Sequence, residues 1–255
     1  MTFVLTALRP IACFLSVALT AASFHLAHMQ LHWLALVAVF LITATTMLQN
    51  DWRDRKHDAA RKEKRLALDH EELFLCALIL FWSWTLCLIA VIFMSHQKLG
   101  TLLAMMALAG AVYSETRRFP MAPITIVALT SASPVLLPVI LGGDFRTVAG
   151  LLGAAALAMF SNEIVKDLGD EPADRGYKWT IPLALGSERA KHIAVAALGL
   201  ALLVAARVSP WTLLGGIPIV MGAALLLKNG SPKTVEYHLD AGMGIVLLLL
   251  ALSGQ

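Results

Sequence analysis

Charged residues are scarce in this sequence: Asp, Glu, Lys and Arg together account for 15% of its 255 residues. Apolar residues account for 58%, and the mean hydropathy is +0.75. Water-soluble domains usually contain about 25% charged residues, because their surface must face water. The composition therefore predicts an all-α, polytopic membrane protein, since a helix satisfies its own backbone hydrogen bonds inside a bilayer.

Cysteine is rare as well. Cys13, Cys76 and Cys87 lie in apolar stretches and have neither the CxxC nor the Cys/His spacing of a zinc site. This pattern excludes a disulfide framework and a structural zinc site. The net charge is only +3, and the basic residues lie in short segments between apolar stretches, so we expect no nucleic-acid partner.

Nine apolar segments are each close to the roughly 20 residues that a helix needs to cross a bilayer. The predicted spans are 10–28, 31–49, 72–94, 98–116, 121–141, 147–165, 190–207, 210–227 and 239–253. They predict nine transmembrane helices in a single domain over residues 1–255.

The distribution of Lys and Arg predicts the orientation of these spans. If the segment 50–71 is cytoplasmic, 17 of the 20 Lys and Arg residues lie on the cytoplasmic side, and only Lys98, Arg146 and Arg207 lie outside. The positive-inside rule supports this scheme, which places the N-terminus in the cytoplasm and the C-terminus outside. Both long polar segments, 50–71 and 166–189, then share the cytoplasmic face, where we expect the chemistry.

The first polar segment begins with a dense acidic run, NDWRDRKHD, at residues 50–58. Asp51, Asp54 and Asp58 are spaced i, i+3 and i+7, which places them on one face of a helix. Three carboxylates on one face repel one another unless a cation lies between them. The spacing therefore predicts a divalent metal site.

The second polar segment repeats this spacing. Asp167, Asp170 and Asp174 again lie at i, i+3 and i+7, although Pro172 is a residue that can break the helix before Asp174. About four spans separate the two runs, so the chain returns to the same side of the membrane and the two acidic clusters can face each other. A plain charged loop is the alternative, but the positive-inside rule explains Lys and Arg rather than ordered Asp.

Carboxylate oxygens are ligands that Mg²⁺ prefers, and Mg²⁺ commonly joins a few carboxylates to a substrate phosphate. Two such ions can bridge the acidic runs to a diphosphate. Nearby cations can bind its remaining oxygens: Arg65, Lys166, Arg175 and Lys178. This arrangement favours departure of diphosphate from a carbon that can bear positive charge.

At these residues the sequence resembles the UbiA superfamily of intramembrane prenyltransferases. Residues 50–58 match its NDxxDxxxD signature, and residues 167–174 are similar to its second aspartate motif, with a trailing TxPxxxG at 180–186. Arg9-Pro10 and Tyr113-x-x-x-Arg117 are also similar to family features, the latter usually being YxxxK. Ala173 departs from the pattern, since the second motif usually has Gly there.

The resemblance implies a helical bundle around a central cavity with a cytoplasmic cap. It also implies transfer of a prenyl group from a polyprenyl diphosphate to a small-molecule acceptor, with Mg²⁺ as the cofactor. We expect an integral protein of the plasma (inner) membrane, in contact with the lipid bilayer and with its active site on the cytoplasmic side.

The resemblance also assigns roles to individual residues. One metal site would use Asn50, Asp51, Asp54 and Asp58, and the other would use Asp167, Asp170 and Asp174. By the same resemblance, the diphosphate would be held or polarised by Arg65, Tyr113, Arg117, Lys166 and Lys178. Substrate binding is expected of Asn50, Arg65, Lys166, Arg175 and Lys178. Catalytic roles are expected for Asp54, Asp170, Tyr113 and Arg117.

Alternatives stay open at this point. The acceptor is an aromatic quinone precursor or a glycerol-phosphate lipid, because Glu163-Ile164-x-Lys166-Asp167 is similar to family members that make ether lipids. The alternative functions are a membrane terpene cyclase that uses the same ionisation, and a non-catalytic lipid carrier. His25, His28 and His32 also share the i, i+3, i+7 spacing, but their place near the predicted outer end of the first two spans favours the membrane interface over metal binding.

Overall fold

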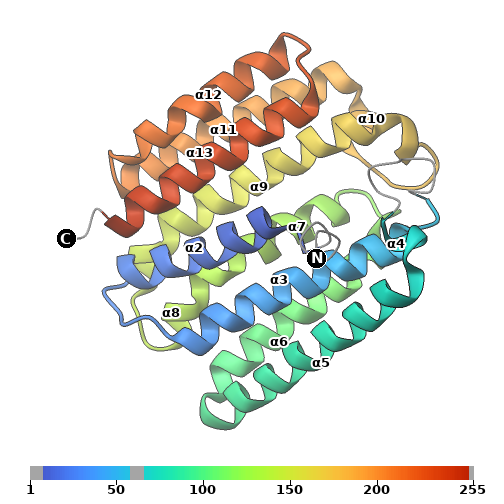
Figure 1. The fold of residues 1–255 in the computed structure, drawn as a ribbon. Coiled ribbons are helices and arrows are strands. Elements are labelled where there is room, and N and C mark those ends of the chain that lie inside the picture. Colours follow the sequence, from blue (N-terminus) through green and yellow to red (C-terminus); the bar gives the residue numbers. More distant parts are fainter. Residues whose placement is uncertain (1–7, 58–65, 253–255) are drawn as a thin grey trace. The chain divides into compact units, whose positions relative to one another are not determined.

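The regular elements of the chain are helices throughout the part that the structure describes (Figure 1). This structure is a computed structural model, and it describes residues 8–57 and 66–252. The all-helical prediction is confirmed for these residues. They form two compact units: residues up to Val17 with His32–Ser114, and Ala18–Leu31 with the chain from Glu115 onward. The division falls within the first described helix, α2 (Pro10–Leu26).

Three long helices build the first unit: α3 (Trp33–Asp54), α5 (Glu71–Ser95) and α6 (Gln97–Val112). They pack side by side, and the short α4 (Leu66–Asp69) leads into α5 (Figure 1). A buried apolar cluster joins α3, α4 and α5 at the end where α3 becomes polar; it consists of Leu48, Ala67, Phe74 and Leu78. Close packing of this cluster therefore fixes the position of the acidic end of α3 relative to α4 and α5.

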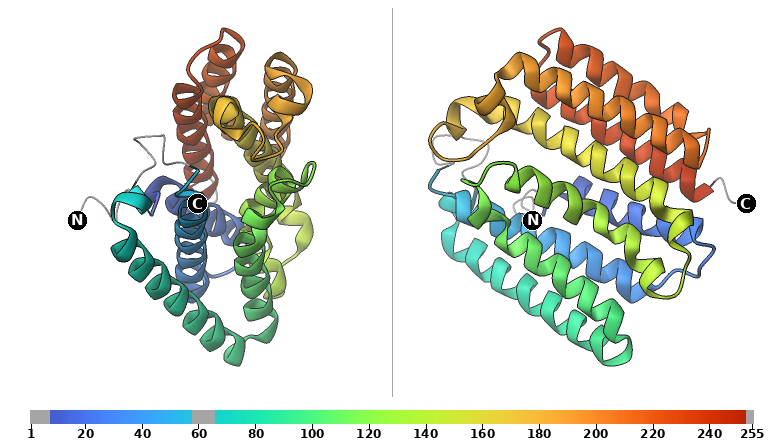
Figure 2. Two further views of the ribbon diagram at one scale, coloured as in Figure 1. Left: turned by 90° about the vertical axis from the view of Figure 1, so that its right-hand side faces the viewer. Right: turned by 180° about the vertical axis from the view of Figure 1, so that it is seen from behind.

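The long helix α9 (Phe145–Asp174) is central to the second unit, because it packs against α7, α11 and α13 (Figure 2). The other elements of this unit are α7 (Ala122–Ala132), η4 (Ser133–Leu136), α8 (Leu137–Ile140), α10 (Ile181–Leu185), α11 (Ser187–Val208), α12 (Thr212–Leu227) and α13 (Pro232–Leu252). Ile164 and Val165 on α9 are fully buried in the apolar core of this unit. The second acidic motif follows them directly, so the core fixes the position from which it extends.

Each of the nine predicted apolar segments is largely helical, but they differ in length. Seven helical segments of the described chain are long and apolar enough to cross a membrane. The apolar helices α2 and α12 are shorter, with 17 and 16 residues. At 1.5 Å per residue these two reach only about 25 Å, against a hydrocarbon thickness of about 30 Å. By length and composition, seven helical segments of the described chain are therefore candidate spans, and the count of nine stays a prediction.

The helices extend further into the polar segments than hydropathy predicted. α9 continues to Asp174, with Pro172 inside its last turn, so Pro172 does not break the helix before the third aspartate. A proline costs the helix one hydrogen bond, and near a helix end few further bonds depend on it. The last helix begins at Pro232 rather than at residue 239, in keeping with the preference for proline in the first helical turn.

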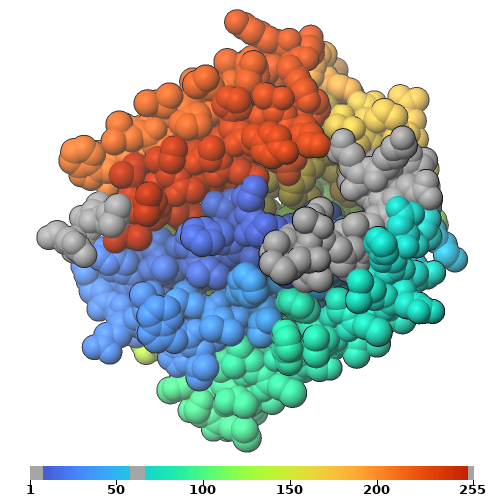
Figure 3. All heavy atoms as spheres, in the orientation of Figure 1, coloured from blue at the N-terminus to red at the C-terminus, as the bar shows by residue number. Residues whose placement is uncertain are grey.

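α12 and α13 approach each other closely along their length, as their adjoining surfaces in Figure 3 illustrate. Gly215 on α12 lies against the backbone of α13: a Cβ atom there would lie 2.8 Å from the Val246 nitrogen and 2.9 Å from the Gly242 oxygen. Real Cβ atoms do not approach backbone atoms this closely. The contact therefore requires glycine at position 215.

We expect Gly215→Ala to lower the free energy of unfolding by about 1–3 kcal/mol, because the added methyl group must push the two backbones apart. Gly199→Ala is the matched control, since a Cβ on this α11 glycine meets no atom within 4 Å. In the control, alanine should raise helix stability by up to about 1 kcal/mol. Thermal unfolding in detergent micelles measures both variants, and equal stability of the two would contradict the close contact.

Candidate functional site

The first aspartate motif lies at the polar end of α3. Asp51 and Asp54 belong to the last turn of this helix, which ends at Asp54, and both side chains are half-buried. Asp58 and Arg65, two of the predicted site residues, lie outside the described residues. The helical geometry predicted for the first motif is therefore observed for Asp51 and Asp54.

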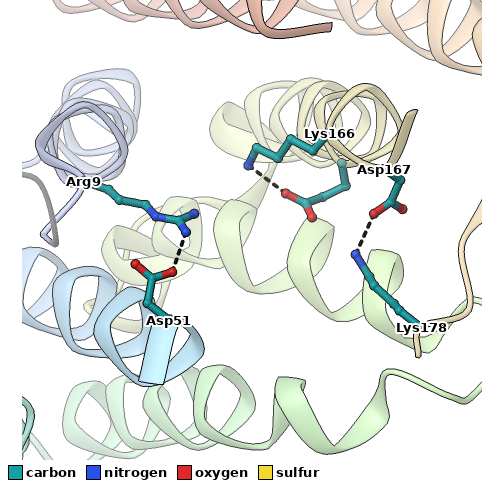
Figure 4. A network of polar contacts seen from close by, with 6 residues as sticks. Arg9, Asp51, Lys166, Asp167 and Lys178 are labelled. Atoms are coloured by element: carbon teal, nitrogen blue, oxygen red, sulfur yellow. Dashed lines mark hydrogen bonds and ion pairs between the residues drawn. The ribbon is translucent and has the colours of Figure 1, made fainter. Parts of the chain in front are cut away.

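Asp51 is held by an arginine from another part of the chain. The Arg9 Nη2 atom lies 2.5 Å from Asp51 Oδ1, and the two side chains point toward each other in Figure 4. Arg9 has a left-handed backbone (φ 46°), a conformation that a residue with a Cβ atom keeps only where its surroundings hold it. The first carboxylate of the motif thus receives a charge-assisted hydrogen bond from outside its own helix.

Two residues inside the motif secure the end of α3. The Arg55 guanidinium lies over the Trp52 ring, 3.8 Å from its centre, and donates a 3.0 Å hydrogen bond to Glu71. Trp52 stacks on Phe74 at 6.2 Å between ring centres. The residues between the aspartates are therefore structural in this unit: they attach the motif to α5.

Asn50 and Tyr113, both predicted to contact substrate, lie at the same end of the first unit. Asn50 Oδ1 accepts a hydrogen bond from Ser114 at 3.4 Å. Tyr113 is half-buried and begins the short 3₁₀ helix η3 (Tyr113–Thr116) that follows α6. The structure thus brings the start of the first motif next to the residue that follows Tyr113.

The second aspartate motif occupies the last turns of α9. Asp167 is only 4% exposed, and Lys178 Nζ lies 2.6 Å from its Oδ1 atom (Figure 4). Lys166 forms a 2.9 Å ion pair with Glu163, which is also buried. A buried carboxylate needs such a cation, because an unpaired charge is costly away from water.

The remaining two aspartates of this motif differ in burial. Asp170 is half-buried and Asp174 is 6% exposed. Arg175 behaves differently from the other predicted cations: its side chain is 74% exposed and lies 3.6 Å from Glu171. The geometry therefore gives Arg175 a carboxylate partner outside the motif.

The segment after α9 holds Arg117 in place. Arg117 is 7% exposed, its Nη1 atom donates to the Tyr177 hydroxyl, and its carbonyl accepts from the Trp179 N–H at 2.7 Å. Gly176, with φ 76°, allows the turn that brings Tyr177 and Lys178 back toward their partners. Two predicted diphosphate-binding cations, Arg117 and Lys178, are thus fixed by the same short segment.

Sequence reasoning missed Tyr177 as a partner of Arg117 and Glu163 as a partner of Lys166. The available signal was weak for both residues. An aromatic residue between Gly176 and Lys178, directly after an acidic motif, is one such signal. For Glu163, the signal was a carboxylate at i−3 from a lysine on one helix, which is a common pairing.

The donor atoms of both motifs suit Mg²⁺, since they are carboxylate and amide oxygens. Within residues 8–57 and 66–252, no group of three or more His, Cys, Asp or Glu side chains converges closely enough to hold a metal ion. Mg²⁺ does not require such a protein cage, because it usually keeps several waters and binds through one or two carboxylates together with substrate phosphates. The residues therefore fit Mg²⁺ that is bound together with a phosphate ligand.

Comparisons with known proteins give a family and a fold. The model of the UbiA prenyltransferase family matches residues 11–233. A UbiA homologue from Aeropyrum pernix K1 has a similar structure, with a TM-score of 0.74 and 16% identity over 97% of both chains. A digeranylgeranylglyceryl phosphate synthase has a TM-score of 0.68 and 19% identity, over 99% of this chain and 98% of that chain.

A third similar structure is a UbiA homologue from Archaeoglobus fulgidus bound to GPP and Mg²⁺. Its TM-score is 0.65 at 20% identity, over 99% of this chain and 98% of that chain. A search of curated proteins gives no significant match. At these identities the structural matches show the fold.

Proposed function

This chain belongs to the UbiA prenyltransferase family, and we propose that it transfers a prenyl group from a polyprenyl diphosphate to an acceptor within the membrane. The observation that carries the proposal is the pair of aspartate motifs, each with its first carboxylate bound to a Lys or Arg. A diphosphate is an anion that these cations can bind, and the carboxylates alone would repel it.

The reaction breaks the bond between the allylic carbon of the prenyl chain and the diphosphate oxygen, and the electron pair leaves with the diphosphate. Lys166, Lys178 and Arg117 donate hydrogen bonds to the diphosphate and stabilise the negative charge that grows on it. Tyr113 polarises the same group through its hydroxyl. The acceptor then attacks the allylic cation, which apolar helices protect from water, and a bond forms between the acceptor and the allylic carbon. The acceptor loses a proton in this step, and the released diphosphate accepts it.

Mg²⁺ is the proposed cofactor. Asn50, Asp51, Asp54 and Asp58 would hold one ion, and Asp167, Asp170 and Asp174 another. When bound, the metal supplies Lewis-acid neutralisation of the leaving diphosphate. Among the structures of similar fold are two of a UbiA homologue from A. fulgidus, one bound to GPP and Mg²⁺ and one bound to DMAPP and Mg²⁺, which supports the choice of metal and donor class.

We propose that all nine apolar helical segments cross the bilayer, with the motifs on the cytoplasmic side of the plasma membrane. The support is the strong bias of Lys and Arg toward one side of the alternating scheme. The two shorter helices fit a bilayer by local thinning or by extension of their flanking residues. The central cavity and the cytoplasmic cap belong to this proposal as well.

The proposed acceptor is an aromatic quinone precursor or a glycerol-phosphate lipid. The likeness in fold to a digeranylgeranylglyceryl phosphate synthase supports including the second class. An assay with both acceptor classes in parallel distinguishes them.

Removal of Mg²⁺ should abolish the transfer. We expect excess EDTA to lower the rate by at least about 100-fold, because the metal supplies several kcal/mol of transition-state stabilisation and each 1.4 kcal/mol is a factor of ten. The assay uses purified protein in lipid nanodiscs, radiolabelled prenyl diphosphates and each acceptor, with product identified by mass spectrometry. Added Mg²⁺ should restore the rate. A cyclic product without acceptor would favour the cyclase, and diphosphate binding without turnover would favour the carrier.

A further inference from the structure

Gln49 directly precedes the first aspartate motif, and its side-chain amide connects three helices. Its Nε2 atom donates to the Ala111 carbonyl on α6 at 2.7 Å. Its Oε1 atom accepts from the Trp82 indole N–H on α5 at 2.9 Å. Both ends of one amide on α3 are thus bound to the two other long helices of the first unit.

The partner on α6 is close to the end of that helix. Ala111 lies two residues before Tyr113, in the last turn, where helix carbonyls lack intrahelical donors. On the other side of Tyr113, Ser114 donates to Asn50 at 3.4 Å. Two consecutive residues of α3, Gln49 and Asn50, therefore hold the chain on both sides of Tyr113.

The approach of α3 to α6 is tight at this place. A Cβ atom on Gly110 would lie 2.3 Å from Thr46 Cγ2, so the two helices touch one turn before Gln49. Glycine at position 110 allows the two helices to approach, but an apolar contact alone does not fix how far one helix is shifted along the other. The hydrogen bond from Gln49 to the Ala111 carbonyl is directional and requires the amide to lie at one height along α6, and the bond from Trp82 holds the same amide against α5.

We propose that Gln49 is a positioning residue that sets the height of Tyr113 relative to Asp51 and Asp54. The expected effect on catalysis rests on the proposed function. The positioning of Tyr113 does not, because it is argued from hydrogen bonds within the first unit. Gln49 itself needs no contact with substrate. Its loss would leave the Ala111 carbonyl and the Trp82 N–H without their partner, and α6 would be free to shift along α3.

Gln49→Ala removes both hydrogen bonds, and Trp82→Phe removes only the one to α5. Thr45→Val is the matched control. Thr45 lies one turn earlier on α3, and its buried hydroxyl is 2.9 Å from that of Thr85 on α5. The control therefore loses a side-chain hydrogen bond between α3 and α5, away from Tyr113. It should lower the midpoint of thermal unfolding as much as Trp82→Phe does.

The first readout is the environment of Tyr113 itself. The chain has only three tyrosines, Tyr113, Tyr177 and Tyr237. Labelling with 3-fluorotyrosine therefore gives three ¹⁹F resonances, and Tyr113→Phe identifies the relevant one. Gln49→Ala should shift or broaden the Tyr113 resonance and leave the other two unchanged, whereas Thr45→Val should leave all three unchanged. An unchanged Tyr113 resonance in Gln49→Ala, or an equal change in Thr45→Val, would overturn the proposal.

The second readout is catalysis by the full-length protein in nanodiscs. A misplacement of about 1 Å costs up to about 100-fold in rate, so Gln49→Ala should lower kcat/KM for the prenyl diphosphate by about 10- to 100-fold. Trp82→Phe should have a smaller effect, because the bond to Ala111 remains, and Thr45→Val should stay within about twofold of the unaltered protein. If Gln49→Ala and Thr45→Val lower kcat/KM equally, Gln49 contributes only to stability, and its proposed positioning role is wrong.

The two proposals fail in different ways. If the unaltered protein transfers no prenyl group to any acceptor, the proposed function is wrong, and the ¹⁹F spectra still decide whether Gln49 positions Tyr113. If transfer occurs and Gln49→Ala matches the unaltered protein in both readouts, only the role of Gln49 is wrong. Should Gln49→Ala fail to fold, Trp82→Phe tests the same bridge through the same resonance.

Discussion

Replacing Asp54 or Asp170 by asparagine should lower prenyl transfer by about 100- to 1,000-fold, the usual cost of removing one preorganised electrostatic group from an active site. Asparagine has nearly the same shape as aspartate, so packing is kept and only the negative charge is lost. Asp54 lies in the last turn of α3 and Asp170 in the last turns of α9, both half-buried. Under the proposed function each contributes to a different Mg²⁺ site.

The measurement is the initial rate in nanodiscs over a series of Mg²⁺ concentrations. Loss of a ligand should also move the half-maximal Mg²⁺ concentration upward. The control is Asp69→Asn, which removes an exposed carboxylate on α4 near the polar end of α5. If either motif variant keeps the rate and the Mg²⁺ dependence of the control, that aspartate has no role in metal binding.

Replacing Lys178 by methionine should destabilise the protein by about 3–5 kcal/mol, because a buried carboxylate then loses its cation. Asp167 is 4% exposed, and the ion pair between Lys178 Nζ and Asp167 Oδ1 is 2.6 Å long. Methionine keeps most of the length of the lysine chain, so the change is mainly one of charge. Unfolding in mixed micelles with increasing SDS measures the difference.

Arg175→Met is the comparison for this second prediction. Arg175 is 74% exposed and its ion pair with Glu171 is longer, at 3.6 Å, so its loss should cost no more than about 1 kcal/mol. The double variant Asp167→Asn/Lys178→Met should recover most of the stability lost in Lys178→Met, without recovering transfer. Equal stability of Lys178→Met and Arg175→Met would show that Asp167 finds another partner.

Hydropathy predicted where the helices lie, because apolar length follows from the thickness of a bilayer. It did not predict where they end. α9 runs on through Lys166–Asp174 because backbone hydrogen bonds continue whether side chains are apolar or polar, and hydropathy measures only the side chains. The converse holds for α12, which is strongly apolar but has only 16 residues, fewer than the roughly 20 that a helix needs to cross a bilayer.

The residue types of the site could be read from the sequence, but most of their partners could not. Asp167 and Lys178 were both predicted as site residues, but their buried ion pair was not predicted. Arg117 and Tyr177 are 60 positions apart, and their contact depends on a turn at Gly176. Such a pair follows from tertiary packing, which composition and periodicity do not encode.

The shortness of α12 has a consequence for the lipid around the protein. Its 16 residues span about 24 Å, several ångströms less than the hydrocarbon layer, and exposed Trp211 and Lys228 flank its two ends. In the proposed topology these interfacial residues draw the headgroups inward, at a cost of a fraction of a kcal/mol for each ångström of mismatch. The close contact with α13 at Gly215 limits how far α12 can tilt or slide on its own. The bilayer, rather than the helix, then deforms on that side of the protein, so the thickness of the surrounding membrane should influence the stability of this protein.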